Sequence, residues 1–508
     1  MNTTASTRVP ETDGWLDRLR NIRSLPVVFL VVALVLTYGY EVFSFNLTID
    51  EEVTSTVGRG ERAGWSVAEG RWGMALFTLF LSNPIAPVVS NGIGIALSGV
   101  AWWLIARRFL VMPAWHAAFA AALGGTIPVL AFIFSFSTIA FAIGIGNLLL
   151  VAFCFGLQSS SWWLRTIAVI SAATAIGVYD TFLVAIAAVA LGLIIKRPTF
   201  PSVALAVGGT VLSLVVSRAI GLIVSFATNL PQSGYTNAFF DIAGLLDTPR
   251  LRAESAIHDV WGVLSLSTER FAISSQWLAV SVFLIVAAAV YALIVMTSPL
   301  TERIIRVVAV AALIALPFCV EAIASVVVLR SMFYLPVVLI VLASVASTGI
   351  VRLAVRPRIV VECVIGAAVV LAVVGNATVA NRSFSIAATT YALDADLASD
   401  SGQQKDRLLG GDNTVDLPVV VNGLHSWPQG AFTPKRETLG LSFFENSAAR
   451  TTEFLRAHGV LVHEATEEQI ERVEDGARDL PVYPESGWVS VDDGVLVLNF
   501  ESEADPDE

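Results

Sequence analysis

Long apolar runs recur along this 508-residue chain, and they constrain its fold more than any other feature. A helix needs roughly 20 mostly apolar residues to cross a hydrocarbon core about 30 Å thick. The chain is 55% hydrophobic and 14% charged, which is too apolar for a soluble protein. The sequence therefore predicts a polytopic α-helical membrane protein with about 11 transmembrane helices. The runs are residues 25–45, 86–106, 114–134, 137–157, 165–178, 181–195, 202–226, 276–296, 307–328, 332–350 and 359–380.

Basic side chains occur in alternate loops between these runs. They fall on the same side of the membrane as the arginine-rich segment 1–24. Cytoplasmic loops carry an excess of Lys and Arg, so the N-terminus is expected in the cytoplasm and the C-terminus outside. The clusters are Arg107 and Arg108, Arg165, Lys196 and Arg197, Arg303 and Arg306, and Arg352, Arg356 and Arg358.

Charge divides the chain into a basic membrane body and an acidic C-terminal part. Residues 382–508 hold 24 Asp and Glu against 9 Lys and Arg, whereas residues 1–381 hold 18 against 22. We expect a membrane body at 25–381, with external loops at 46–83 and 227–275. A small extracytoplasmic α/β domain is expected at 382–500 and a disordered acidic tail at 501–508. The acidic balance argues against a nucleic-acid partner.

Within the C-terminal part, sequence patterns predict individual elements. Residues 417–422 are rich in β-branched side chains, and residues 448–457 and 466–475 have helical character. The stretch Asp492-Asp493-Gly494 between two apolar runs predicts a β-hairpin at 488–500. The three cysteines lie in apolar runs and indicate neither a disulfide framework nor a metal site.

The first external loop carries three consecutive carboxylates, at Asp50, Glu51 and Glu52. Carboxylates at the membrane surface are either exposed to water or have a functional role. Of the three, Glu52 is the one most readily assigned to solvent. A later helix in this loop is expected to lie in the interface. Trp65 and Trp72 are seven residues apart, so they would share its apolar face.

Five further charged residues lie in or beside the predicted spans. They are Glu41, Asp180, Arg218, Glu321 and Arg330, and all fall in the outer half of the membrane. Charges in a bilayer generally face a polar cavity or pair with one another, so we expect a cavity that opens outward. The alternatives are that Arg330 snorkels, Asp180 caps a helix, Glu41 is solvated, and Arg218 pairs with Glu321 for structural reasons. We identify no comparable charges in the cytoplasmic half.

Several motifs resemble bacterial membrane glucosyltransferases of the O-antigen-modifying type II family. They are Thr48-Ile49-Asp50-Glu51-Glu52, Glu69-Gly70-Arg71-Trp72-Gly73, Asn83-Pro84-Ile85-Ala86-Pro87, Gly177-Val178-Tyr179-Asp180, Tyr483-Pro484-Glu485-Ser486-Gly487 and Asp493-Gly494-Val495. The resemblance implies a GT-C-like enzyme in the bacterial cytoplasmic membrane that uses a polyprenyl-phosphate sugar. It also implies that Asp50 is the catalytic carboxylate. Glu51 stands where a second Asp is expected.

The chemistry of glycosyl transfer assigns further roles. Asp50 would deprotonate the acceptor hydroxyl, with Glu51 as its partner. Arg218, Arg71 or Arg330 would bind the departing phosphate. Asp180 and Glu321 would face the substrate. Trp65 or Trp72 would stack on a sugar or anchor the loop in the membrane.

The expected function is transfer of a sugar, glucose by the resemblance, from polyprenyl phosphate to a cell-surface glycopolymer. We predict no cofactor and leave a divalent metal open. One alternative is a transporter or flippase, which would also need polar residues through the inner half of the bundle. Another is a non-catalytic assembly protein that presents the C-terminal domain.

Overall fold

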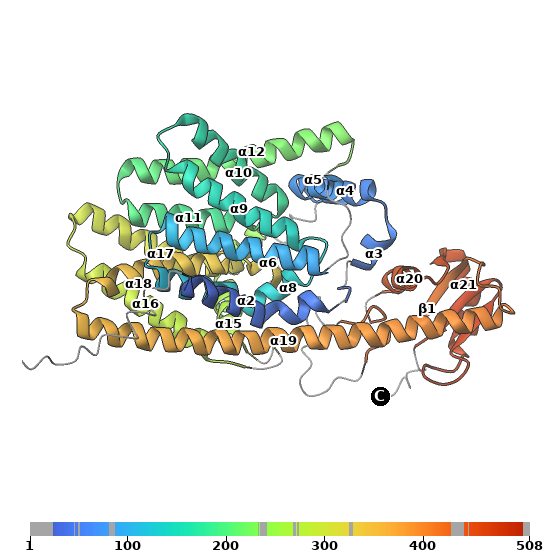
Figure 1. Ribbon diagram of the computed structural model, residues 1–508. Helices are drawn as coiled ribbons and strands as arrows, with labels where there is room; N and C mark the ends of the chain where they lie inside the picture. The colour runs from blue at the N-terminus through green and yellow to red at the C-terminus, as the bar shows by residue number, and fades with distance from the viewer. Residues whose placement is uncertain are drawn as a thin grey trace, which may run out of the picture.

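The chain forms a helical bundle with a small domain at one end (Figure 1). The computed structural model describes residues 24–44, 46–48, 51–80, 87–231, 233, 241–267, 271, 274–324, 329–427, 441–445 and 447–500. Asp50 lies outside these ranges, as do most of the expected N-terminal segment and all of the expected acidic tail.

Eight helices of the described chain are long and apolar enough to cross a membrane. A ninth segment is a pair of helices bent by 55°, formed by α7 (Ala114–Gly125) and the stretch Pro128–Phe134, which contains η2 and α8. Two shorter apolar helices, α10 (Trp162–Val178) and α11 (Phe182–Lys196), match the two shortest predicted runs. The eight are α2 (Leu25–Phe43), α6 (Pro87–Leu104) with η1 (Ile105–Phe109), α9 (Ala140–Leu157), α12 (Phe200–Thr228), α16 (Trp277–Val295), α17 (Leu300–Ile323), α18 (Leu335–Val351) with η3 (Leu329–Met332), and α19 (Val355–Leu408).

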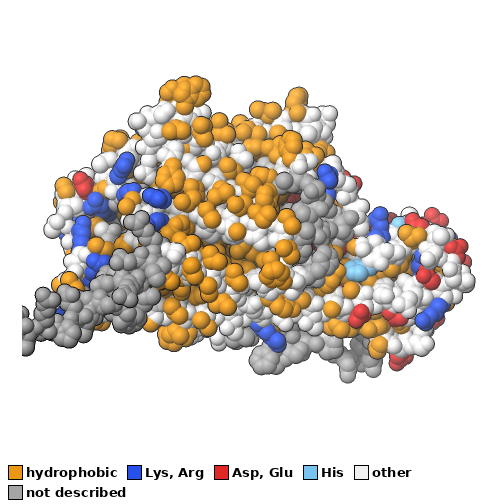
Figure 2. All heavy atoms as spheres, viewed as in Figure 1, with side chains coloured by type: hydrophobic (Ala, Val, Ile, Leu, Met, Phe, Trp, Pro, Cys, Tyr) orange, Lys and Arg blue, Asp and Glu red, His pale blue; other side chains and the backbone are white. Residues whose placement is uncertain are grey.

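Close packing holds the bundle together around α18, which is buried along most of its length. Where α6 crosses α9, a Cβ at Gly94 would lie 2.3 Å from the carbonyl oxygen of Ala140. Only glycine permits that approach, as is common where helices associate in membranes. Hydrophobic side chains cover the flank of the bundle, and Lys and Arg gather at the end opposite the small domain (Figure 2).

Helix α19 joins the bundle to the C-terminal domain without a break (Figure 1). We expected the membrane body to end at residue 381, where the polar pair Asn381 and Arg382 interrupts the apolar run. The helix instead continues to Leu408, because no Gly or Pro occurs between Gly375 and Gly402, and its 54 residues span roughly 80 Å in total. The membrane anchor and the first element of the domain are therefore one rigid rod.

The C-terminal domain is a four-stranded sheet in the order β2-β1-β4-β3. Strand β1 is parallel to β2 and β4, whereas β3 is antiparallel to β4. Asp493 and Gly494 have φ of 46° and 75° in the predicted hairpin turn, as a type I′ turn requires. The elements are β1 (Leu417–Asn422), α20 (Ala448–Ala457), β2 (Val462–Glu464), α21 (Glu467–Arg478), β3 (Val489–Asp492) and β4 (Val495–Asn499). All but β2, which was not predicted, lie close to the predicted positions.

The two faces of this sheet are covered by different helices. Val495 and Val497 of β4 pack with α21, while Leu496 and Leu498 face a core that includes Leu397 of α19 and residues of α20. This alternation follows from the period of two along a strand. Because α19 contributes to the domain core, the domain is held at a fixed place at the end of the bundle.

The segment expected to be the first external loop forms three short helices, α3 (Glu51–Thr56), α4 (Arg59–Ala68) and α5 (Trp72–Phe80). The prediction of a single interfacial helix that carries both Trp65 and Trp72 is wrong. Gly70 has φ of 79° and turns the chain between α4 and α5. Trp65 and Trp72 therefore lie on different helices, and Trp65 is exposed while Trp72 is buried.

The second external loop also contains helices, α14 (Ile242–Asp247) and α15 (Pro249–Leu264). It is tied to the end of α17. The backbone N–H of Asp241 donates to the carbonyl of Ile323, and Arg252 donates to the carbonyl of Ala324 at 2.9 Å. Asp241 and Arg252 also form an ion pair. This loop therefore packs against the C-terminal end of α17.

Candidate active site

Glu51 anchors the first external loop to the bundle. Its Oε2 accepts hydrogen bonds from the N–H and hydroxyl of Thr48, at 3.1 and 3.0 Å. Its Oε1 accepts from the Ser137 hydroxyl and the Thr138 N–H, both at 2.9 Å. A carboxylate has about four acceptor positions, and all of these are used. Burial raises the pKa of Glu51, and the bonds from Thr138, Thr48 and Ser137 oppose that shift.

This arrangement fixes the chain on both sides of Asp50. Thr48 precedes Asp50 by two residues, and Glu51 follows it directly. The bonds from Glu51 reach the segment between α8 and α9, so Glu51 is held near the end of the bundle that carries the C-terminal domain. The role of Asp50 itself stays a prediction.

Glu52 is not solvated, contrary to our expectation. Its side chain is 0% exposed and forms an ion pair at 2.8 Å with Arg450 of α20. One turn further on, the Thr56 hydroxyl donates to Glu453, also of α20. The C-terminal domain therefore covers α3. The burial of Glu52 could not be predicted from neighbouring residues, because its partner is almost 400 residues away in the chain.

A second cluster lies at the junction of α10 and α11. Asp180 pairs with Arg218 of α12 at 3.1 Å, and Arg71 acts electrostatically on the same carboxylate. The guanidinium of Arg71 lies 4.6 Å from the centre of the Tyr179 ring and also pairs with Glu69 at 2.8 Å. Asp180 therefore does not cap α11 with its side chain, as the alternative expectation held.

The Asp180–Arg218 pair retains binding capacity. Asp180 Oδ2 is buried and accepts no hydrogen bond from the residues that the structure describes. The Arg218 side chain is 47% exposed. A buried acceptor without a donor is unfavourable unless another group supplies one. The pair thus offers an acceptor and a cation side by side.

Trp72 has a packing role in place of the expected sugar contact. It is 6% exposed, and its indole N–H donates to the Ser217 carbonyl at 3.1 Å. The ring lies against the backbone of α10, where a Cβ at Gly177 would come within 2.4 Å of it. A ring enclosed in this way has no face for a sugar or for lipid headgroups. It positions Arg71, its neighbour in sequence.

Glu321 and Arg330 lie further along the same end of the bundle. Tyr334 donates to Glu321 at 3.4 Å, and the guanidinium of Arg330 lies 5.5 Å from the centre of the Phe136 ring. Phe136 is adjacent to Ser137, which binds Glu51. Arg218 pairs with Asp180, so the expected structural pairing of Arg218 with Glu321 is replaced by a different one.

Aromatic contacts connect these groups into one region. The centre of the Phe333 ring lies 5.4 Å from that of the Tyr179 ring. The guanidinium of Arg71 also contacts the Tyr179 ring. Phe333 follows Arg330 in the η3 segment by three residues. These pairwise contacts link Glu51, Arg330, Arg71 and the Asp180–Arg218 pair through neighbouring side chains at the end of the bundle that faces the C-terminal domain.

Sequence reasoning misjudged Glu41. It was expected to be solvated, but it is 1% exposed, and within the described chain neither carboxylate oxygen has a hydrogen-bond partner. It lies near enough to Glu51 for the two charges to interact. Ser137 and Thr138 were also missed, although a short polar stretch between apolar runs was a visible signal. No cluster of three or more His, Cys, Asp or Glu side chains suited to a metal occurs among the described residues.

Comparisons with known proteins give a family match and a structural likeness. The sequence model of the family described as "Glucosyl transferase GtrII" matches residues 39–373. The crystal structure of ArnT from Cupriavidus metallidurans bound to undecaprenyl phosphate is 16% identical, with a TM-score of 0.33, over 91% of this chain and 82% of that one. The apo ArnT structure is 14% identical, with a TM-score of 0.35, over 89% and 90%. No curated protein sequence matches the chain.

Proposed function

Because the chain belongs to the glucosyl transferase GtrII family, we propose that it transfers glucose from a polyprenyl-phosphate donor to an envelope glycopolymer. Family membership supports the enzyme over the transporter alternative. A lipid-borne donor suits a site that lies at one end of a bundle of apolar helices. The donor enters from the bilayer and the acceptor from the aqueous side.

The observation that carries this proposal is the Asp180–Arg218 pair beside Arg71, in the same region as the loop anchored by Glu51. Departure of the donor phosphate develops negative charge, and Arg218 is placed to stabilise it. Asp180 Oδ2, which is buried without a donor in the described chain, accepts a sugar hydroxyl in this scheme.

Asp50 is the proposed general base, and Glu51 is its positioning residue. A base must reach the acceptor hydroxyl within hydrogen-bond distance. Glu51 uses all of its acceptor positions within the protein, so it supports the loop and leaves the proton transfer to Asp50. Arg330 and Glu321 complete the proposed substrate-facing set.

We propose eleven spans, with the N-terminus in the cytoplasm and the C-terminal domain outside. The count adds α10, α11 and the bent pair to the eight long helices. The orientation follows from the gathering of Lys and Arg at the end opposite the domain (Figure 2). The site then faces the outer side of the cytoplasmic membrane of a bacterium.

Transfer of labelled glucose from polyprenyl-phosphate glucose in membrane vesicles tests the assignment. Asp50→Asn keeps the size of the side chain and removes the base, so transfer should fall by at least about 100-fold. Glu61→Gln is the matched control, because Glu61 is an exposed carboxylate of the same loop, on α4. Undiminished transfer by Asp50→Asn would refute the role of Asp50. Absence of transfer by the wild-type protein with any polyprenyl-phosphate sugar would refute the proposed donor.

A further inference from the structure

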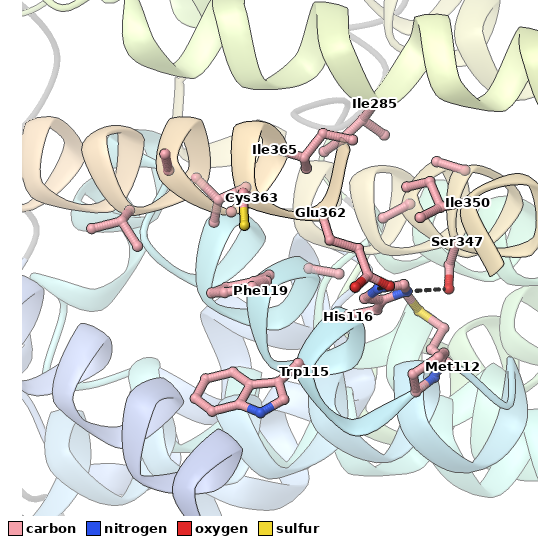
Figure 3. A pocket seen from close by; sticks show the side chains of 18 of the residues that line it. Met112, Trp115, His116, Phe119, Ile285, Ser347, Ile350, Glu362, Cys363 and Ile365 are labelled. Atoms are coloured by element: carbon pink, nitrogen blue, oxygen red, sulfur yellow. Dashed lines mark hydrogen bonds and ion pairs between the residues drawn. The ribbon is translucent and has the colours of Figure 1, made fainter. Parts of the chain in front are cut away.

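A large apolar cavity lies at the end of the bundle opposite the C-terminal domain. Its volume is about 1040 Å³, at the upper end of the range for ligand pockets. It is lined by α7, α16, α18 and α19 and is open on one side, where Ile359, Val370 and Leu371 are exposed (Figure 3). Trp115, Phe119, Ile285, Ile350 and Ile365 line it. The cavity is separate from the proposed active site at the other end.

A polar cluster closes one end of the cavity. His116 Nδ1 lies 2.6 Å from the Ser347 hydroxyl, and its Nε2 lies 3.2 Å from Glu362 Oε1 (Figure 3). Arg358 Nε donates to the same oxygen of Glu362 at 2.8 Å. We expected no charges in this half of the bundle, so the cluster corrects that prediction. The local signals for this cluster were weak, because His116 and Glu362 lie within apolar runs far apart in the chain.

Arg358 has further donors available at the mouth of the cavity. Its Nε is used by Glu362, and its side chain is 29% exposed. The guanidinium carries two more nitrogens, which are suited to bidentate contact with a phosphate. Arg352 and Arg356 are exposed at the end of α18 and the start of α19 but do not line this cavity. Arg358 is therefore the basic group of the mouth, whereas the interior is apolar.

The length of the cavity matches one leaflet of a bilayer. Along α19 its lining runs from Arg358 to Leu371, which are 13 residues apart and hence about 20 Å apart along the helix. Half of a bilayer, with its headgroup region included, is about 20 Å thick. A chain with its polar group at Arg358 would reach the middle of the membrane near Leu371.

We propose that this cavity binds an anionic phospholipid, with its phosphate on Arg358 and an acyl chain along α19. A basic mouth above an apolar interior of leaflet length fits that chemistry. The cytoplasmic leaflet, on which this end lies in the proposed topology, is the one that attracts basic juxtamembrane groups. The lipid is a structural ligand distinct from the sugar donor.

Photolabelling of the full-length protein tests the proposal. The probe is phosphatidylglycerol with a diazirine in its acyl chain, at low content in phosphatidylcholine nanodiscs, and labelled peptides are mapped by mass spectrometry. Labels should concentrate on α7 and on the first half of α19, and unlabelled phosphatidylglycerol should displace them. Ala346→Phe fills the cavity and should abolish this labelling. Val364→Phe is the control, because Val364 lies on the outer surface of α19.

The headgroup contact is tested separately, in case Ala346→Phe does not fold. Arg358→Gln should weaken displacement by phosphatidylglycerol about tenfold, because one charge-assisted contact is lost. Arg303→Gln is the control, because Arg303 is exposed at the same end of the bundle, and it should leave displacement by phosphatidylglycerol unchanged. Three results would overturn the proposal: labelling spread evenly over the outer helices, equal displacement by phosphatidylcholine, or tighter displacement by polyprenyl phosphate. The readout is independent of glucosyl transfer, so the two proposals fail separately.

Discussion

Removal of Arg450 should loosen the loop that carries the proposed catalytic carboxylate. In the structure, Arg450 of α20 pairs with Glu52 of α3, directly after Asp50 and Glu51. Arg450→Met keeps most of the aliphatic stem and leaves the Glu52 carboxylate buried without its cation. The C-terminal domain would then no longer hold α3 against the end of the bundle.

The magnitude follows from the burial of the pair. Breaking a buried ion pair by removing one partner costs about 3–5 kcal/mol. Glu52 is 0% exposed but Arg450 is 27% exposed, so water relieves part of the penalty and the lower end, about 3 kcal/mol, applies. An opening free energy lowered by that amount makes the open state about 100-fold more populated. Glu52→Gln should cost less, because Arg450 can reach water.

Hydrogen exchange measures this directly. Amides of α3 should exchange about 100-fold faster in Arg450→Met, with a parallel loss of transfer activity. The double variant Glu52→Gln with Arg450→Met should be no worse than Arg450→Met alone, a coupling of about 2 kcal/mol. Arg478→Met is the matched control, since Arg478 forms an exposed ion pair with Glu474 of its own helix, α21, and no contact with α3 is seen among the described residues. If the free-energy effects of the two single variants sum to that of the double variant within about 0.5 kcal/mol, the two residues are not coupled and the prediction is refuted.

Three more predictions test other parts of the molecule. Arg218→Lys keeps the charge but loses the planar fork, so transfer should fall by roughly 100-fold with the protein still folded, as circular dichroism would show. Gly177→Ala forces a Cβ into the Trp72 ring, so thermal melts should show the free energy of unfolding lowered by about 1–3 kcal/mol. Gly58→Ala is the control, because no atom lies within 4 Å of the new Cβ and no clash is expected. Burial lowers the pKa of His425 in the C-terminal domain, so the unfolded state binds the proton more readily, and the domain should lose stability as pH falls through about 6.5. His425→Phe should remove this part of the pH dependence, and an unchanged profile would contradict it.

Local signals in the sequence were enough to place most helices and strands. A membrane leaves few choices, since every backbone group in a span must be satisfied within the segment, and apolar runs therefore become helices. In the C-terminal domain, β1 and the turn at Asp493 and Gly494 follow from β-branched residues and turn chemistry. The motifs also predicted the family correctly, because they are short and local.

Local signals failed where tertiary packing decided the outcome. The polar pair Asn381 and Arg382 ended the apolar run but not the helix, because neither residue breaks the backbone ladder. Trp72 was expected to contact a sugar or lipid, but its ring packs closely against Gly177 of α10 and is buried there. Hydropathy and helical periodicity describe one segment at a time, so they do not report which other segment covers it.

The sequence by itself determined the membrane class, the order of the elements and the carboxylate-bearing loop, because each depends on neighbouring residues. Only the tertiary structure decided which charges meet. Arg218 pairs with Asp180, and Glu52 is covered by Arg450, almost 400 residues away. Electrostatic pairing depends on distance in space, and in a bundle of many helices several arrangements satisfy the same apolar pattern. The different contacts of the adjacent carboxylates Glu51 and Glu52 were therefore decided by packing and not by their order in the chain.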